Sequence, residues 1–475
     1  MTLRPETVAV LPSPKRLIEA LRDVGYDFTA AVADLVDNSL AASATRVDIQ
    51  VRWDGADSWV RIADDGVGMN GATITEALRF GSERSYRPDD LGKFGLGLKT
   101  ASLSQCRQIL VASRTNERVA RIEARRFDLD RILTDDKWEV ELLAAADRPE
   151  ELIQPLAEHP GTVVVWSQLD RLLGTRTPRG ERTQRSLWDQ VESLEQHLGM
   201  VFHRFIEGDV GGRRKREPLV LTLNENTIQP WNPFAVNEEH TEHLQVLDFD
   251  ISVGGSSGVV TFDPWVLPAK DKFSSEAEFN RLSGPARWNQ QQGLYVYRAN
   301  RLIQSGGWSR LRAPDEHTKL ARAALDFYPE LDGAFGINIA KMRVSLPQQL
   351  RERLRAPIED QIRVAKRAYN PKSGRKSPPS SGQANPALAG APAEPADRPH
   401  TPPPAATPEK TGHRPTAPRS EDSVAPWPPP PLSPRVPPRK ALEKAASATG
   451  DEDALERIVK VLAEAEPGVA RDLGW

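Results

Sequence analysis

The spacing of apolar residues changes several times along the N-terminal part of the chain. A period of three to four residues predicts a helix, whereas a period of two or a short apolar run predicts a strand. Helical spacing occupies three segments: Lys15–Arg22, Phe28–Ala42 and Ile74–Phe80. Strand patterns occupy Thr45–Trp53, Trp59–Ala63, Gln108–Ser113, Val119–Arg125 and Thr162–Trp166. Helices interleaved with antiparallel-looking strands predict an α/β sandwich.

A second mixture of elements follows a helix-like stretch that begins at Ser186. Strands are predicted at Leu219–Leu223, Val259–Phe262 and Leu294–Asn300, and helical patterns occupy Glu316–Asp326 and Gln348–Arg367. This length suits a second α/β domain. We therefore expect two folded domains, residues 1–185 and 186–369.

The composition changes sharply after Tyr369. More than half of the 40 prolines fall between Pro371 and Lys440, mixed with Ser, Ala, Gly, Lys and Arg. Such a segment buries too little apolar surface to offset its ordering entropy, which predicts a disordered Pro-rich linker over residues 370–440. Residues 441–475 carry one amphipathic pattern, within Asp451–Leu473, that predicts a short helical element for docking a protein partner.

Charge and cysteine content exclude several classes. Net charge is −3 from 63 basic and 66 acidic residues, so the whole chain has no electrostatic preference for nucleic acid or membrane. Cys106 is the single cysteine, which rules out an intrachain disulfide. The sequence has neither a signal-peptide pattern nor an apolar run of about 20 residues, so we expect a cytoplasmic protein that does not contact the membrane.

Candidate chemistry begins in the second predicted helix. Asp34 and Asn38 are one helical turn apart and would project from the same face. A carboxylate beside a carboxamide suits the polarisation of a water molecule and the coordination of a hard cation such as Mg²⁺. The alternative is an acidic, solvated helix face, which this stretch alone would favour by about two to one.

A strand end supplies the next candidate. Asp64 closes an apolar run, and Gly66 and Gly68 follow it. Two glycines at this spacing let the backbone turn sharply and approach a flat ligand closely. The carboxylate could accept a hydrogen bond from an exocyclic amine such as that of adenine. The alternative is an ordinary tight turn, for which Asp-Gly is a common composition.

A glycine-rich stretch spans Gly92–Ser102, ahead of a run that is compatible with a helix. Its backbone amides could cradle phosphates at a helix N-terminus, and Lys93 and Lys99 could add positive charge. It does not fit a Walker P-loop, because Leu98 separates Gly97 from Lys99 and no strand directly precedes the loop. By itself, the stretch is about as compatible with a surface loop.

Taken in order with the apolar strand Gly161–Trp166, these stretches resemble the GHKL superfamily of gyrase B subunits, ninety-kilodalton heat-shock chaperones, histidine kinases and MutL. The sequence is most similar to the MORC ATPases and their bacterial relatives, which pair a DNS-containing helix with a DxGxGM strand end and a GxFGxGxKxxS lid. The resemblance is strong over Val8–Trp166 and weaker over Leu219–Phe234 and Gly293–Trp308. It implies a Bergerat-type ATP-binding domain followed by a transducer-like α/β domain.

The resemblance also implies roles for individual residues. Asp34 would act as the general base and Asn38 would coordinate Mg²⁺. Asp64 would bind the adenine amine with support from Thr162, in a base pocket lined by Gly66, Gly68 and Met69. The lid over the phosphates would comprise Gly92, Lys93, Phe94, Gly95, Leu96, Gly97 and Lys99. Lys341 would reach the γ-phosphate, although a solvent-facing lysine is the simpler interpretation by about three to one.

The function that the resemblance implies is an ATP-gated homodimerisation clamp that associates with DNA, of a restriction or antiphage type. Asp34 stands where most of the family has Glu, so its carboxylate is one methylene short. We therefore expect slow hydrolysis, on the order of one turnover per minute or less, against about 10 per second for a typical enzyme. The basic stretch Gly211–Arg216 could contact DNA phosphates, or be a solvated hairpin tip.

Three other functions stay open. A chaperone-like ATPase would act on proteins, but the chain lacks the long middle and C-terminal domains of that family. A histidine kinase is disfavoured, because no histidine precedes His159 to serve as phosphoacceptor. A module that binds ATP without hydrolysing it is possible because of Asp34.

Overall fold

The computed structural model describes residues 12–23, 26–80, 97–116, 121–174, 179–208, 217–337, 344–370 and 459–460. Several predictions therefore lie outside the described residues: the lid residues Gly92–Leu96, the basic stretch Gly211–Arg216, Lys341 and the Pro-rich linker. Of the predicted C-terminal helix, Val459 and Lys460 are described, and both are helical. The described residues up to 370 fall within one compact unit, and the two helical residues fall within another.

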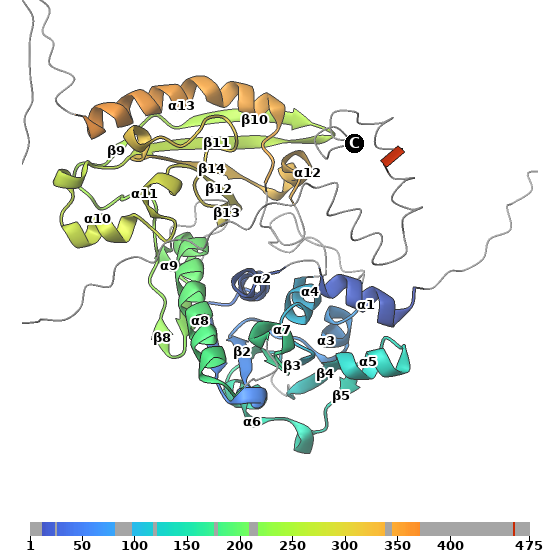
Figure 1. Cartoon of the computed structure of the whole chain (residues 1–475). Coiled ribbons are helices and arrows are strands. Elements are labelled where there is room, and N and C mark those ends of the chain that lie inside the picture. Colours follow the sequence, from blue (N-terminus) through green and yellow to red (C-terminus); the bar gives the residue numbers. More distant parts are fainter. Residues whose placement is uncertain are drawn as a thin grey trace, which may run out of the picture. The chain divides into compact units, whose positions relative to one another are not determined.

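An eight-stranded sheet organises residues 12–228, which we call the N-terminal lobe. Its strand order is β5-β4-β3-β6-β2-β1-β7-β8. Figure 1 labels β5, β4, β3, β2 and β8 of this sheet. All neighbours are antiparallel except β1 and β7. The strands are β1 Arg46–Arg52, β2 Trp59–Asp64, β3 Gln108–Arg114, β4 Glu123–Asp128, β5 Glu141–Leu142, β6 Gly161–Ser167, β7 Val220–Leu223 and β8 Asn226–Thr227.

Helices cover both faces of this sheet. The alternation along β2 and β6 sends Ile62 and Trp166 into the large core beneath α1, α2, α4 and α8, and sends Ala63 and Val165 into a smaller core beneath α6. The helices are α1 Pro14–Arg22, α2 Phe28–Ala41, α3 Gly71–Ala77, α4 Gly97–Leu103, α5 Leu129–Asp135, α6 Glu150–Ile153, α7 Asp170–Leu173, α8 Glu181–Val201 and α9 His203–Glu207. Short 3-10 turns are η1 Gly55–Asp57, η2 Ala145–Asp147 and η3 Gln154–Leu156.

A second sheet organises residues 229–370, the C-terminal lobe. Its strand order is β10-β11-β14-β12-β13, and β9 pairs with β11. Among these pairs, β12 and β14 are parallel. The strands are β9 Glu242–His243, β10 Leu247–Val253, β11 Ser256–Val266, β12 Gly293–Arg298, β13 Arg301–Gln304 and β14 Ala321–Phe327. The helices are α10 Glu276–Leu282, α11 Arg287–Gln290, α12 Asp332–Phe335 and α13 Gln348–Tyr369, with 3-10 turns η4 Lys270–Lys272, η5 Glu316–Thr318 and η6 Pro329–Leu331.

The core of the N-terminal lobe continues past residue 185, the domain boundary expected from the sequence. α8 contributes Leu187, Leu194 and Leu198 to that core. Strand β7 pairs with β1, so Leu221 lies beside Val47 in the first sheet. The buried side chains of this core extend to Ile228.

The helix expected at Glu316–Asp326 is wrong for most of its length. After the short turn η5, residues Ala321–Phe327 form β14, which lies between β11 and β12 inside the second sheet. Six of its seven residues are buried. A strand covered on both faces shows a continuous apolar run, and periodicity alone does not distinguish such a run from a buried helix.

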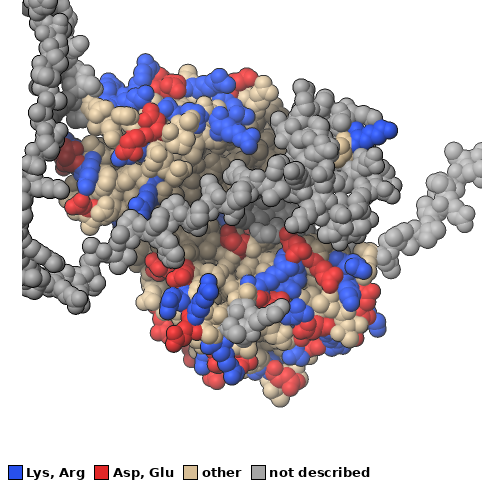
Figure 2. All heavy atoms as spheres, viewed as in Figure 1, with Lys and Arg blue, Asp and Glu red and all other residues tan. Residues whose placement is uncertain are grey.

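The surface carries both signs of charge. On the face shown in Figure 2, described Lys and Arg side chains are interspersed with Asp and Glu over both lobes. Within the described ranges, none of the helices is long and apolar enough to cross a lipid bilayer.

Candidate functional site

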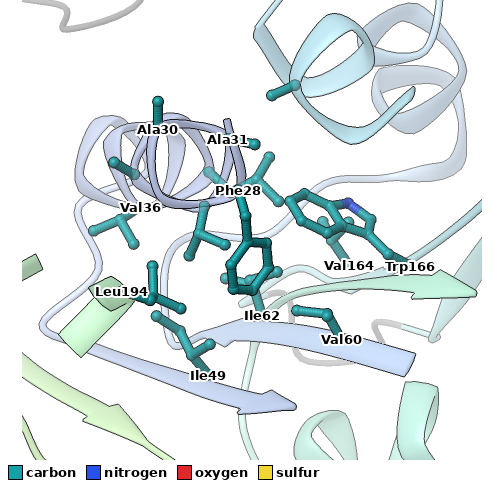
Figure 3. Packing of buried hydrophobic residues seen from close by; sticks show 14 of the residues in the cluster. Phe28, Ala30, Ala31, Val36, Ile49, Val60, Ile62, Val164, Trp166 and Leu194 are labelled. Carbon is teal, nitrogen blue, oxygen red and sulfur yellow. The ribbon is translucent and has the colours of Figure 1, made fainter. Parts of the chain in front are cut away.

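Helix α2 carries the first predicted site residues and is buried nearly all round. It begins after Asp27, whose carboxylate accepts a hydrogen bond from the Ala30 amide at 2.7 Å and so caps the helix. Phe28 points toward the strands and meets Trp166 edge to face, with ring centroids 6.4 Å apart (Figure 3). Each large apolar side chain buried here contributes about 1.5–3 kcal/mol. This packing fixes the rotation of α2 and hence the direction of its polar side chains.

Asp34 and Asn38 differ in exposure. Asp34 is 2% exposed, and its Oδ2 accepts a hydrogen bond from the Tyr26 hydroxyl at 2.8 Å. Burial, together with the Asp34 charge, raises the pKa of Tyr26 well above its usual value, so this hydroxyl stays protonated. A Cβ at Gly97 would lie 3.2 Å from Asp34 Oδ2, which places the start of α4 against the carboxylate. Asn38, one turn along, is exposed.

Asp64 ends β2 in a cradle of three donors. Its Oδ1 accepts from the Gly66 amide at 2.9 Å and from the Thr162 amide at 3.2 Å, and its Oδ2 accepts from the Ser39 hydroxyl at 2.9 Å. Burial raises the pKa of this carboxyl, and the three donors oppose that rise. A carboxylate offers about four lone-pair positions, so these contacts leave one acceptor position on Oδ2.

The turn after Asp64 approaches its neighbours closely. Val67 donates to the Ala42 carbonyl at 3.0 Å, and Met69 donates to the Ser113 hydroxyl at 2.7 Å. Gly68 has a φ of +69°, and a Cβ there would lie 2.0 Å from the Arg114 carbonyl oxygen. Only glycine fits such a position. The glycine at position 68 is therefore explained first by contact with β3.

Thr162 meets Asp64 through its backbone rather than through its hydroxyl. The Thr162 amide is the donor, whereas its Oγ1 lies 2.9 Å from Ser113 Oγ. Ser113 Oγ also lies 2.6 Å from the Gly161 carbonyl, to which it donates. Since Ser113 accepts from Met69 as well, one hydroxyl connects β3, β6 and the turn.

Lys99 has a structural environment that the sequence did not predict. It lies in α4, is 1% exposed, and its Nζ donates to the carbonyl oxygens of Ala77 at 2.9 Å and Arg79 at 2.6 Å. These contacts are at the C-terminal end of α3, where a cation is favoured. Burial lowers the pKa of Lys99 to about 8. In the structure its ammonium group therefore tethers α4 to α3.

The described site residues come from three parts of the first sheet and its helices. The Ser39–Asp64 and Ala42–Val67 hydrogen bonds join α2 to the end of β2, and Thr162 adds β6. Gly97 of α4 adds a fourth part, which lies against Asp34. The segments so joined carry Asp34, Asn38, Asp64, Gly66, Gly68, Met69 and Thr162. The remaining candidates, Gly92, Lys93, Phe94, Gly95, Leu96 and Lys341, lie outside the described residues.

Sequence reasoning missed three supporting side chains. Ser39 directly follows Asn38, so its place beside the candidate residues was a signal. Tyr26 and Ser113 carry no comparable signal, because Tyr26 precedes the helix and Ser113 reaches the site only through the pairing of β3 with β6.

The donor set at α2 fits Mg²⁺ only together with phosphate. Among the residues that the structure describes, no three His, Cys, Asp or Glu side chains gather to hold a metal ion. Mg²⁺ usually takes one or two protein oxygens and completes its octahedron with water and substrate phosphates. The exposed Asn38 amide oxygen is compatible with that arrangement.

The sequence of this chain is similar to that of several known proteins. Residues 26–159 match a family described as histidine kinase-, DNA gyrase B- and HSP90-like ATPase. A DNA mismatch repair protein MutL from Gemmatimonas aurantiaca is 42% identical over 71 residues, covering 15% of this chain and 12% of that protein. The ATPase morc-1 of Caenorhabditis elegans is 29% identical over 208 residues, covering 42% of this chain and 24% of that protein.

A longer match involves a DNA mismatch repair protein MutL from Erwinia tasmaniensis. It is 24% identical over 268 residues, which cover 54% of this chain and 38% of that protein. The chain thus matches well under half of the length of these relatives.

Proposed function

We propose that this chain binds ATP, hydrolyses it slowly and uses it to gate a dimeric, DNA-associated clamp. The match of residues 26–159 to the histidine kinase-, DNA gyrase B- and HSP90-like ATPase family supports ATP binding directly. The rate of ATP hydrolysis, the dimerisation and the association with DNA each need a test by experiment.

The arrangement of Asp64 carries the proposal. Three donors hold its carboxylate rigidly and leave an acceptor position on Oδ2. That position suits the exocyclic amine of adenine, which is a donor. Ser39 links Asp64 to α2, so base recognition and the polar residues of α2 belong to one site.

Asp34 is the group that would accept the proton of the attacking water. Its carboxylate is held by the Tyr26 hydroxyl, which limits its rotation. A general base must come within about 2.6–3.2 Å of the proton donor, and an aspartate reaches less far than a glutamate. Slow turnover follows from that shorter reach. Asn38 would hold Mg²⁺, which supplies positive charge to the phosphates when bound.

The association with DNA is supported by the names of the relatives. Two of the relatives are named as DNA mismatch repair proteins and one as an ATPase. A phosphate-dependent change in lobe docking would shift the population toward a closed dimer. Because charges of both signs are interspersed on the face in Figure 2, DNA contacts there would come from local basic groups.

Asp34→Asn tests the hydrolysis step. The amide has nearly the same shape but cannot take a proton, so we expect ATP turnover to fall about 100-fold or more while affinity for a non-hydrolysable analogue is retained. Phosphate release and calorimetric binding measure the two quantities. Asp57→Asn is the control, because its side chain is 76% exposed. Wild-type turnover in Asp34→Asn would refute the role of Asp34.

Oligomeric state and DNA retention test the clamp. Light scattering and DNA retention at several salt concentrations are measured with and without the non-hydrolysable analogue. We expect a dimer, and salt-resistant DNA retention, only with the analogue. If neither quantity depends on nucleotide, the clamp proposal is wrong although ATP binding stands.

A further inference from the structure

The hairpin between β12 and β13 joins the two lobes beside α2. Its two-residue turn, Ala299-Asn300, has φ angles of +48° and +68°, which match the tight turn favoured between antiparallel strands. Ala299 packs against the core of the N-terminal lobe, and strand β13 contacts α8. Arg301 is the first residue of β13, so the turn presents it at the lobe junction.

Arg301 forms a buried ion pair with Asp37 of α2. The Arg301 Nε lies 3.3 Å from the Asp37 carboxylate, and the two side chains are 5% and 0% exposed. Asp37 is three residues from Asp34 and adjacent to Asn38. Residues three apart are neighbours on a helix surface, so the ion pair and Asp34 share one side of α2.

The charge of Arg301 also reaches other groups around α2. It counteracts the burial that raises the pKa of Tyr26, the donor to Asp34. Burial lowers the pKa of His197 in α8 to about 4, and the charge of Arg301 adds to that decrease. The charge of Arg301 is therefore felt by Tyr26, which donates to Asp34, and by His197 of α8.

A buried ion pair contributes little net stability, because desolvation cancels much of the attraction. Its geometry is nevertheless strict, since removing either partner leaves an uncompensated buried charge. A bond of this kind across two lobes makes the position of α2 depend on the docked hairpin.

We propose that Arg301 is a positioning residue for ATP hydrolysis, holding Asp37 so that Asp34 and Asn38 face the nucleotide only when the β12–β13 hairpin is docked on α2. The inference rests on the proposed function. It makes the C-terminal lobe part of the hydrolytic machinery through a residue that acts on α2 by way of Asp37.

A second ion pair on the same hairpin provides a matched control. Arg298, the last residue of β12, binds Asp332 with Nε 2.7 Å from Oδ1, and both side chains are 4% exposed. This pair is as buried as Arg301–Asp37, but both partners belong to the C-terminal lobe. Arg298→Met therefore removes a buried arginine whose ion pair lies within the C-terminal lobe.

The experiment measures kcat, KM, affinity for a non-hydrolysable ATP analogue and the unfolding temperature of the full chain. We expect Arg301→Met to lower kcat at least tenfold, equivalent to about 1.4 kcal/mol in the barrier, with analogue affinity changed by less than about threefold. Arg298→Met should lower the unfolding temperature while keeping kcat within about threefold of wild type.

Two further variants cover the case in which Arg301→Met fails to fold. Asp37→Asn keeps the shape of the carboxylate, and Arg301→Lys keeps the charge with fewer donors. Both should lower kcat more than they change analogue affinity, and Asp37→Asn combined with Arg301→Lys should lower kcat little further than either alone.

Two outcomes overturn the inference. One is wild-type kcat in folded Arg301 and Asp37 variants. The other is an equal loss of kcat in Arg298→Met, which would mark a general effect of destabilisation. An inactive wild-type chain that still binds ATP would instead refute the proposed hydrolysis, so the two failures are distinguishable.

Discussion

Replacing Asp64 by Asn should separate nucleotide binding from folding. In Asp64→Asn the amide oxygen can take the place of Oδ1 and keep the bonds from the Gly66 and Thr162 amides. The amide nitrogen then faces Ser39, whose hydroxyl can accept a hydrogen bond from it. That hydroxyl can at the same time donate to the Leu35 carbonyl, which lies 3.2 Å from it in the structure. The cradle remains satisfied, so we expect the free energy of unfolding to change by about 1 kcal/mol or less.

The affinity for ATP should change more than the stability does in Asp64→Asn. The acceptor position left on Oδ2 becomes an N–H donor that faces the adenine amine, which is also a donor. Loss of one hydrogen bond to a charged acceptor costs about 1.5–3 kcal/mol, or a decrease of about 10- to 150-fold in affinity. Inosine triphosphate carries a carbonyl oxygen in place of that amine. Its affinity relative to ATP should therefore rise in Asp64→Asn.

Calorimetric titration with non-hydrolysable ATP, hydrolysis assays with both nucleotides and thermal unfolding measure these effects. Asp65→Asn is the matched control, because the Asp65 carboxylate binds the Thr45 and Arg46 amides at the start of β1. If folded Asp64→Asn binds ATP as tightly as wild type, Asp64 does not recognise the adenine amine.

Two other perturbations test the framework. Gly68→Ala would place a Cβ 2.0 Å from the Arg114 carbonyl oxygen at a φ of +69°, so it should destabilise the fold by more than about 3 kcal/mol. Gly254→Ala has a similar φ of +59° and nothing within 4 Å, so it should cost only about 1 kcal/mol in the same denaturant titration. Burial lowers the pKa of His197 from 6.5 to about 4. Between these pH values the unfolded chain binds a proton that the folded chain does not, so the free energy of unfolding falls as pH falls. His197→Gln should remove about 3 kcal/mol of this acid sensitivity between pH 7 and 4. His159→Gln, at an exposed position, is the control, and equal pH dependence in both variants would refute the assignment.

Much of the N-terminal lobe was predictable because its patterns are local. Strand β2 and helix α2 begin within a residue of their predicted starts, since alternation and helical spacing are both complete within those segments. The failure at β14 has the opposite cause. Its continuous apolar run is compatible with a helix or a strand, and it forms a strand because it pairs with β11 and β12.

The sequence by itself determined which residues could form a nucleotide site: Asp34 and Asn38 one turn apart, and Asp64 before two glycines. Local spacing suffices there because the helix and the turn are short-range structures. Only the tertiary structure decided the partners of these residues. Thr162 reaches Asp64 across 98 positions and Arg301 reaches Asp37 across 264, through strand register and lobe docking. Those contacts depend on how distant segments pack, and no local pattern encodes that packing.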